Sequence, residues 1–265
     1  MEHNSEDQQR FDEPSLEDFL VEEIDPSKEK WIKRRKNMIR SGAAVIALVF
    51  LISTFSVFST YINLPAMEFL KISFQLSQRD DIKRYKRAVV AVEGNNVKGT
   101  GFNISKEGYI ITNFHVIEDM KQILVHFSDG HTFKAKVDKK YPNVDLAFLE
   151  IAGENLPELD LAKGLEALNG EKVFVIGNPL AFYQIANRGK MIGLREVNGI
   201  EIPVLEVTAP VYRGNSGSPV IDEEGKVVAV VFASTIPKVN SGEAIEGLAI
   251  PIDEVVTRLP SGLEE

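Results

Sequence analysis

Short runs rich in β-branched and aromatic residues dominate residues 87–251, and this pattern constrains the fold more than any other feature. Gly, Asn, Asp and Pro separate the runs, as they do at strand ends. One long interruption, at 153–170, divides twelve runs into six and six. The first six are 87–93, 97–104, 108–113, 122–127, 131–137 and 144–151, and the second six are 172–177, 184–194, 201–208, 218–222, 226–233 and 246–251. Many short, evenly spaced strands are typical of barrels or sandwiches. The division predicts an all-β fold made of two small six-stranded barrels.

Two glycine-containing turns support this strand pairing. S-D-G at 128–130 lies between the fourth and fifth runs, and E-E-G-K at 223–226 precedes the eleventh. Glycine at such positions is typical of β-hairpins. A short helix is expected at 253–259, after the last run.

The first 62 residues have a different character. Residues 1–27 hold ten acidic residues and one arginine, and few apolar residues accompany them, which is typical of a disordered tail. Residues 28–40 hold seven basic residues and one glutamate, and residues 41–62 carry no charge. Because about 20 apolar residues span a bilayer, this uncharged stretch is predicted to be a transmembrane helix.

Two other interpretations of residues 41–62 are a buried core helix and a cleaved signal peptide. The helices that pack against the core of a soluble domain usually have a polar face toward solvent, and this stretch has none. A signal peptide has a shorter apolar region and no long leader. The basic cluster at 28–40 is expected to stay in the cytoplasm, which places the N-terminus inside and everything after residue 62 outside.

Composition excludes several classes of function. The net charge of −9 argues against nucleic-acid binding, since neutralising phosphates needs a basic surface. The chain has no cysteine, which excludes a disulfide framework and a thiol nucleophile. None of the four histidines is in an H-E-x-x-H pattern. Neither a metal nor a cofactor is expected.

Ser216 is a candidate nucleophile because it lies in the glycine-flanked loop R-G-N-S-G-S-P at 213–219. A serine nucleophile needs a histidine base and a carboxylate that orients the base. No histidine follows Ser216, so the order Ser, acid, His of the α/β-hydrolases is impossible. The available order is His115, Asp145, Ser216. Two backbone N–H groups of the loop, those of Gly214 and Ser216, could turn toward one point and stabilise an oxyanion.

Each member of this set also has an ordinary interpretation. His115 could be a half-buried histidine at the end of the third strand, and Asp145 could be a turn residue before the sixth. The serine loop could be a surface turn. The remaining histidines are poorer bases: His126 and His131 flank a hairpin and are expected to face solvent, and His3 lies on the other side of the membrane.

Six segments together resemble the trypsin-like serine proteases of the bacterial HtrA/Deg type, in family order. They are G-T-G-F (99–102), T-N-F-H-V (112–116), D-L-A (145–147), V-I-G-N-P (175–179), R-G-N-S-G-S-P (213–219) and G-L-A-I-P (247–251). The resemblance implies a double six-stranded barrel with His115 as base, Asp145 as its orienting group and Ser216 as nucleophile. It also implies an oxyanion hole from the backbone of Gly214, Asn215 and Ser216, protein or peptide substrates, and a homotrimer.

The sequence also departs from the family. Ser218 replaces a second glycine, and residues 182–193 differ from the family's version. Since the sequence ends at Glu265, no C-terminal PDZ domain is expected. The predicted domains are a cytoplasmic tail and basic segment (1–40), a transmembrane helix (41–62), a connector helix (63–85), a trypsin-like domain (86–258) and a C-terminal tail (259–265).

The leading functional hypothesis is a membrane-anchored serine endopeptidase that cleaves misfolded or surface proteins outside the cytoplasm. One alternative is a proteolytically silent, chaperone-like protein that binds peptides on the same fold. Another is an esterase that uses the same three residues.

Overall fold

The computed structural model describes residues 26–61, 64–95, 97–165, 169–179, 182–235 and 246–263. The chain forms two compact units, 1–63 and 64–265. The predicted acidic tail up to residue 25 lies outside the described residues.

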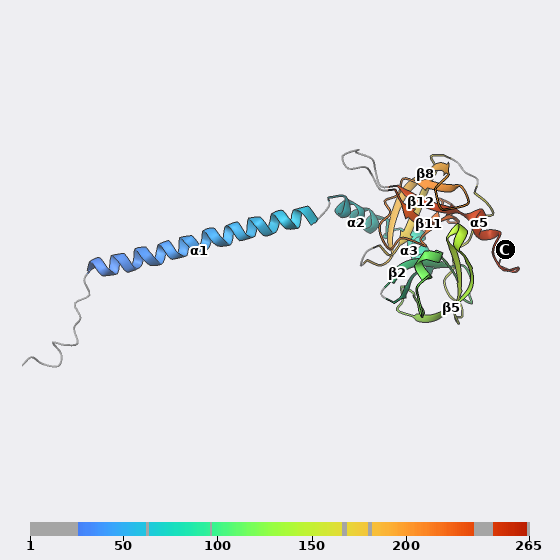
Figure 1. Ribbon diagram of the computed structural model, residues 1–265, viewed down its shortest axis with the longest axis horizontal. Coiled ribbons are helices and arrows are strands. Elements are labelled where there is room, and N and C mark those ends of the chain that lie inside the picture. Colours follow the sequence, from blue (N-terminus) through green and yellow to red (C-terminus); the bar gives the residue numbers. More distant parts are fainter. Residues whose placement is uncertain are drawn as a thin grey trace, which may run out of the picture. The chain divides into compact units, whose positions relative to one another are not determined.

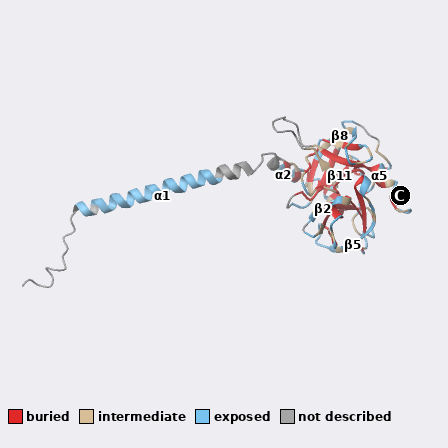
Figure 2. Ribbon diagram, viewed as in Figure 1, coloured by how far each residue is buried: buried red, intermediate tan, exposed pale blue. Residues whose placement is uncertain are grey.

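The described residues of the first unit form one helix, α1 (Pro26–Tyr61). Within the described residues, one stretch is long and apolar enough to cross a membrane: Lys30–Thr54, with 25 residues and a mean hydropathy of 1.6. None of its most apolar window is buried, and the described side chains of α1 are exposed in Figure 2. This exposure does not fit a core helix. The helix begins earlier than the predicted span at 41–62 because the basic segment is helical too.

The second unit begins with two helices where one connector helix is predicted. They are α2 (Leu64–Leu76) and α3 (Asp80–Ala88). Both contribute to the core of this unit: Phe69 and Leu76 of α2 are buried, as are Ile82, Tyr85 and Ala88 of α3. The Oγ atom of Ser73 also accepts the backbone N–H of Ala186 at 3.1 Å. The segment is therefore part of the folded unit.

Six strands form a first closed antiparallel barrel in the order β1-β2-β3-β6-β5-β4. They are β1 (Val89–Gly94), β2 (Val97–Asn103), β3 (Tyr109–Thr112), β4 (Ile123–His126), β5 (Thr132–Tyr141) and β6 (Leu146–Glu150). A single helical turn, α4 (Phe114–Ile117), follows β3, and a 3-10 turn, η1 (Pro142–Val144), precedes β6.

Six more strands form a second closed barrel in the order β10-β11-β12-β9-β8-β7. They are β7 (Lys172–Gly177), β8 (Ile185–Arg195), β9 (Val204–Val207), β10 (Pro219–Ile221), β11 (Val227–Ser234) and β12 (Gly247–Pro251), and α5 (Ile252–Val256) follows. In Figure 1 the labelled strands β8, β11 and β12 gather on one side of the compact unit and β2 and β5 on the other. The predicted fold of two six-stranded barrels is confirmed.

The interiors of both barrels are apolar, as the β-branched sequences predict. Every residue of β3, β10 and β12 is buried, and so are the first five residues of β11. One cluster of buried side chains fills much of the first barrel around Val90, Ile110 and Leu149. A larger cluster includes the second barrel and the inner face of α3. Because burial concentrates in the strands (Figure 2), the loops at their ends are free to carry polar side chains.

Candidate active site

His115 and Asp145 are brought together by the pairing of β3 with β6. Thr112, the last residue of β3, lies opposite Ala147 of β6, so the residues just after β3 face those just before β6. His115 lies in the single turn α4, and Asp145 ends the 3-10 turn η1. The expectation that His115 ends a strand misses this helical turn, which turns the chain away from the sheet.

Two hydrogen bonds join these residues. Oδ2 of Asp145 lies 2.7 Å from Nδ1 of His115, and Oδ1 accepts the backbone N–H of His115 at 2.9 Å. Because a carboxylate accepts, the ring nitrogen that faces it carries the hydrogen, which leaves Nε2 as the acceptor. The Asp145 side chain is only 11% exposed, whereas that of His115 is 45% exposed. The imidazole is therefore oriented from the inside and open on its other side.

The backbone around Asp145 is fixed as well. Asp145 has a φ of 53° and a ψ of 43°, in the left-handed region, which Asp tolerates better than most residues. Its carbonyl accepts the side-chain amide of Asn113 at 2.9 Å and the backbone N–H of Phe114 at 3.3 Å. These contacts hold the main chain from which the carboxylate projects.

Ser216 lies on a loop whose glycines are required by its geometry. Gly214 and Gly217 have φ values of 100° and 86°, which favour glycine. A Cβ atom at Gly217 would overlap the carbonyl oxygen of Thr100. The backbone N–H of Thr100 donates to the carbonyl of Ser216 at 2.8 Å. The loop is thus fastened against β2 of the first barrel.

β2 also contacts the segment that carries His115. A Cβ atom at Gly99 of β2 would lie 2.6 Å from Val116, the residue after His115. The loop of Ser216 is bonded to Thr100, the residue after Gly99. The three predicted residues therefore belong to one region, beside the middle of β2 and at the adjoining ends of β3 and β6.

The Ser216 hydroxyl has a partner other than His115 in this structure. It donates to the carbonyl of Phe232 at 3.5 Å. Across the described residues, no hydrogen bond joins it to His115. In enzymes without bound substrate, hydrogen bonds between catalytic groups are often long or poorly aligned, and they tighten when the substrate binds.

The backbone donors of the loop differ from the predicted set. The N–H of Asn215 donates to the carbonyl of Tyr212 at 3.0 Å. The N–H groups of Gly214 and Ser216 have no acceptor among the residues that the structure describes. Asn215 therefore does not supply a free N–H in this conformation, whereas the N–H groups of Gly214 and Ser216 are unpaired within the described part of the chain.

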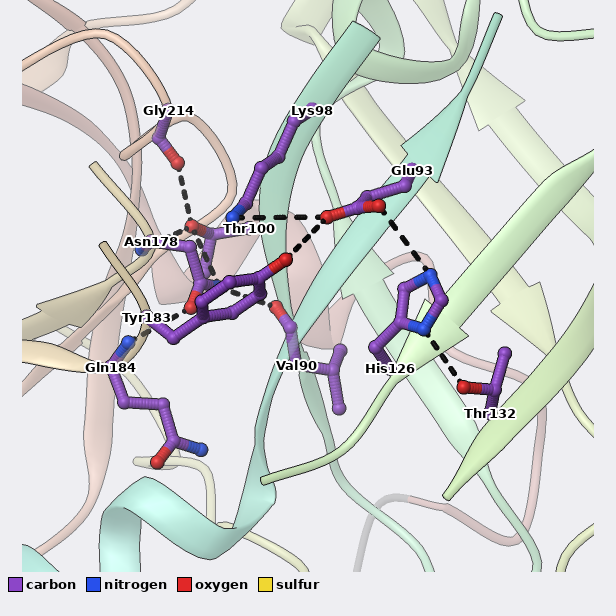
Figure 3. Close-up of polar contacts among 10 residues, drawn as sticks. All are labelled: Val90, Glu93, Lys98, Thr100, His126, Thr132, Asn178, Tyr183, Gln184 and Gly214. Carbon is purple, nitrogen blue, oxygen red and sulfur yellow. Dashed lines mark hydrogen bonds and ion pairs between the residues drawn. The ribbon is translucent and has the colours of Figure 1, made fainter. Parts of the chain in front are cut away.

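His126 differs from its expected position. Nδ1 of His126 lies 2.8 Å from the hydroxyl of Thr132, and Nε2 lies 3.6 Å from Glu93 (Figure 3). Its side chain is 28% exposed, against 71% for His131. The prediction that His126 faces solvent is wrong, because the neighbouring strand β1 places Glu93 beside its ring. His131 is exposed, as predicted.

Two buried polar residues near the serine loop were not singled out as site residues by the sequence analysis. Thr100 and Asn178 are 0% and 1% exposed. Both lie in segments quoted for the family resemblance, G-T-G-F and V-I-G-N-P, where a polar residue stands among glycine and apolar residues. Such a residue must find hydrogen-bond partners when it is buried, and this was the available signal.

Comparison with known proteins agrees with this geometry. Residues 99–230 match the family model described as "Trypsin-like peptidase domain". A probable periplasmic serine endoprotease of Pseudomonas fluorescens, described as DegP-like, is 37% identical over 169 residues, which are 62% of this chain and 35% of the relative. A protein of the same description from Ectopseudomonas mendocina is 32% identical over 222 residues, 82% of this chain and 43% of the relative.

The solved structures include the serine endoprotease from Yersinia pestis. It is 29% identical, with a TM-score of 0.59, and the match covers 69% of this chain and 65% of that one. The chain spans 35% and 43% of the two curated relatives described above. The family match, the two closed barrels and these relatives together show that this chain contains a trypsin-like peptidase domain.

Proposed function

We propose that this chain is a membrane-anchored serine endopeptidase. The single observation that carries the proposal is the pair of hydrogen bonds that Asp145 accepts from His115. The glycine-flanked Ser216 lies in the same region, and the N–H groups of Gly214 and Ser216 have no acceptor among the described residues. The DegP-like serine endoproteases that the chain resembles support the same reaction class.

The proposed reaction begins with a rotation of Ser216. Its hydroxyl leaves the Phe232 carbonyl and donates to Nε2 of His115. Oγ then attacks the carbonyl carbon of a peptide bond, and its proton passes to Nε2. Asp145 stabilises the resulting imidazolium through its hydrogen bond to Nδ1.

The negative charge that forms on the peptide oxygen needs donors. In this proposal the N–H groups of Gly214 and Ser216 supply them, and each such donor accounts for roughly 3–4 kcal/mol in other enzymes. The amine of the product leaves with the proton from Nε2. A water molecule then hydrolyses the acyl-enzyme by the same route in reverse order, which restores Ser216.

The location follows from the N-terminal helix in this proposal. The stretch Lys30–Thr54 is long enough to cross a membrane, and the basic cluster at 28–40 favours a cytoplasmic N-terminus. The peptidase unit would then act outside the cytoplasm, on misfolded or surface proteins. The periplasmic location in the relatives' descriptions supports this side. A homotrimer is proposed on resemblance alone, and sedimentation of the detergent-solubilised chain tests it.

The test compares the purified full chain with Ser216→Ala on an unfolded protein and on a small ester. We expect the wild type to yield peptides that mass spectrometry maps to internal cleavage sites, and Ser216→Ala to yield none. A wild type that binds the unfolded protein without cutting it would support the peptide-binding alternative. Cleavage of the ester alone would support an esterase.

A further inference from the structure

One buried hydroxyl connects both barrels to the loop that carries Ser216. Oγ1 of Thr100, in β2, lies 2.7 Å from the carbonyl oxygen of Gly214 and 2.9 Å from the backbone nitrogen of Asn178, which follows β7. Figure 3 shows the hydroxyl between these two partners. Thr100 and Asn178 are almost fully buried, so water does not compete for these bonds.

The direction of each hydrogen bond is determined by the partners. A carbonyl oxygen only accepts and a backbone N–H only donates, so Thr100 donates its one hydrogen to Gly214 and accepts from Asn178. The side-chain amide of Asn178 also donates to the carbonyl of Val90 in β1 at 2.9 Å. The hydroxyl is therefore held on one side by the framework and uses its only hydrogen on the serine loop.

The carbonyl that Thr100 holds belongs to the peptide between Gly214 and Asn215. The same peptide is held at its other end, where the N–H of Asn215 donates to Tyr212. The two free donors lie on either side of it: the N–H of Gly214 belongs to the preceding peptide and that of Ser216 to the following one. Rotation of the held peptide changes ψ of Gly214 and φ of Asn215, and so changes the angle between the two donors.

Glycine makes this rotation easy. Gly214 has a φ of 100° and no Cβ atom to restrict its ψ. The loop itself holds only the N–H end of this peptide, through the bond from Asn215 to the Tyr212 carbonyl, so the carbonyl end needs a partner from outside the loop. The Thr100 side chain supplies that group in the described structure.

We propose that Thr100 is a positioning residue, whose hydroxyl orients the Gly214–Asn215 peptide so that the N–H groups of Gly214 and Ser216 converge on the oxyanion. This role rests on the proposed function. It predicts that loss of the hydroxyl impairs the chemical step and leaves substrate binding in place.

The experiment uses the full chain in detergent and two substitutions at one position. Thr100→Val keeps the shape of the side chain and removes its hydrogen bonds, whereas Thr100→Ser keeps the hydroxyl and removes a methyl group. The control is Ser105→Ala. Ser105 is also buried, and its hydroxyl accepts the backbone N–H groups of Gly108 and Tyr109, away from the serine loop.

Three quantities are measured on a peptide taken from the wild-type digest: kcat, KM and the inhibition constant of the corresponding peptide aldehyde. The aldehyde forms a tetrahedral adduct with the serine and so requires the oxyanion donors. Removal of one such donor lowers kcat by about 100- to 1,000-fold in other enzymes, and for the misoriented pair in Thr100→Val we expect a fall of about 10- to 100-fold. KM should stay within about 3-fold, and the aldehyde should bind more weakly in proportion to kcat.

Thr100→Ser should restore kcat to within about 3-fold of the wild type, and Ser105→Ala should lower thermal stability without lowering kcat. If Thr100→Val does not fold, Thr100→Ala takes its place in the same three measurements. If the wild type is active and the variant without the hydroxyl has the same kcat, the role of Thr100 is wrong and the proposed function stands. The same conclusion follows if Thr100→Ser is as slow as Thr100→Val. A wild type without any peptidase activity would overturn the proposed function and this role together.

Discussion

Asp145 holds His115 at two points, with one carboxylate oxygen 2.7 Å from Nδ1 and the other 2.9 Å from the backbone nitrogen. One group thus sets both the position of the backbone and the direction of the ring. Asp145→Asn keeps the size of the side chain but places an amide N–H against Nδ1. The imidazole must then carry its hydrogen on Nε2, where it cannot accept the proton of Ser216.

We expect Asp145→Asn to lower kcat by about 10⁴-fold with little change in KM, as for the equivalent change in other triad enzymes. Steady-state kinetics on a peptide substrate checks this. Asp138→Asn is the matched control, because Asp138 accepts the Tyr109 hydroxyl at 2.6 Å and an amide oxygen can still accept it. Near wild-type kcat in Asp145→Asn would show that this carboxylate does not orient the base.

Gly217→Ala tests the packing of the serine loop on β2. The new methyl group would overlap the Thr100 carbonyl oxygen, and the residue would keep a φ of 86°. Gly130→Ala is the control, because Gly130 has a φ of 93° and, apart from its two chain neighbours, no described residue has an atom within 4 Å of the point that its new methyl group would occupy.

Left-handed backbone costs an alanine about 1–2 kcal/mol, so this loss in the free energy of unfolding is expected in both variants. Gly217→Ala should lose about 1–3 kcal/mol more, because the backbone must shift to admit the methyl group. It should also lose most of its peptidase activity. Thermal denaturation of both variants measures the difference, and equal losses would contradict the tight contact.

Phe69 of α2 tests whether the segment before the barrels is part of the folded unit. Phe69 is 4% exposed, and the centroid of its ring lies 4.9 Å from that of the Tyr212 ring in an edge-to-face arrangement. We expect Phe69→Ala to lower the free energy of unfolding by about 3–5 kcal/mol, as for other buried aromatic residues. Phe74 lies in the same helix and is 70% exposed, so Phe74→Ala should change the free energy of unfolding by less than about 0.5 kcal/mol. Similar values for the two variants would place α2 outside the fold.

The membrane topology is tested in cells. With epitopes at residue 5 and beyond residue 70, external protease added to intact spheroplasts should remove the second epitope and spare the first. The reason is the basic cluster at 28–40, which favours the cytoplasmic side. Loss of the first epitope alone would reverse the proposed orientation, and loss of neither would place both ends inside.

The barrels could be predicted because their strands are short, apolar and separated by turn residues. In β11, the run Val227–Val231 is buried throughout. A short run of β-branched residues indicates a strand even when both of its faces are buried. The hairpin turns could be predicted from their glycines. In the structure Gly130 and Gly225 have positive φ values, which glycine adopts more easily than other residues. The division of the connector into α2 and α3 was missed, because no proline or glycine marks the break at 77–79.

The candidate residues could be predicted from their order and local setting, but their contacts could not. Whether Asn215 has a free N–H depends on the position of the Tyr212 carbonyl, which no local pattern specifies. The same holds for His126, whose environment is determined by Glu93 on a neighbouring strand. Thr100 and Gly214 are 114 residues apart in sequence, and only the packing of the two barrels brings them together.

The central claim is that Ser216 is a nucleophile activated by His115, and covalent labelling tests it most directly. The full chain is treated with a fluorophosphonate, which phosphonylates an activated serine and releases fluoride, and the modified peptide is sequenced by mass spectrometry. The account predicts one adduct, on Ser216, that is absent from Ser216→Ala and forms several orders of magnitude more slowly in His115→Ala. Labelling of another residue, or no labelling of a folded wild type, would contradict it.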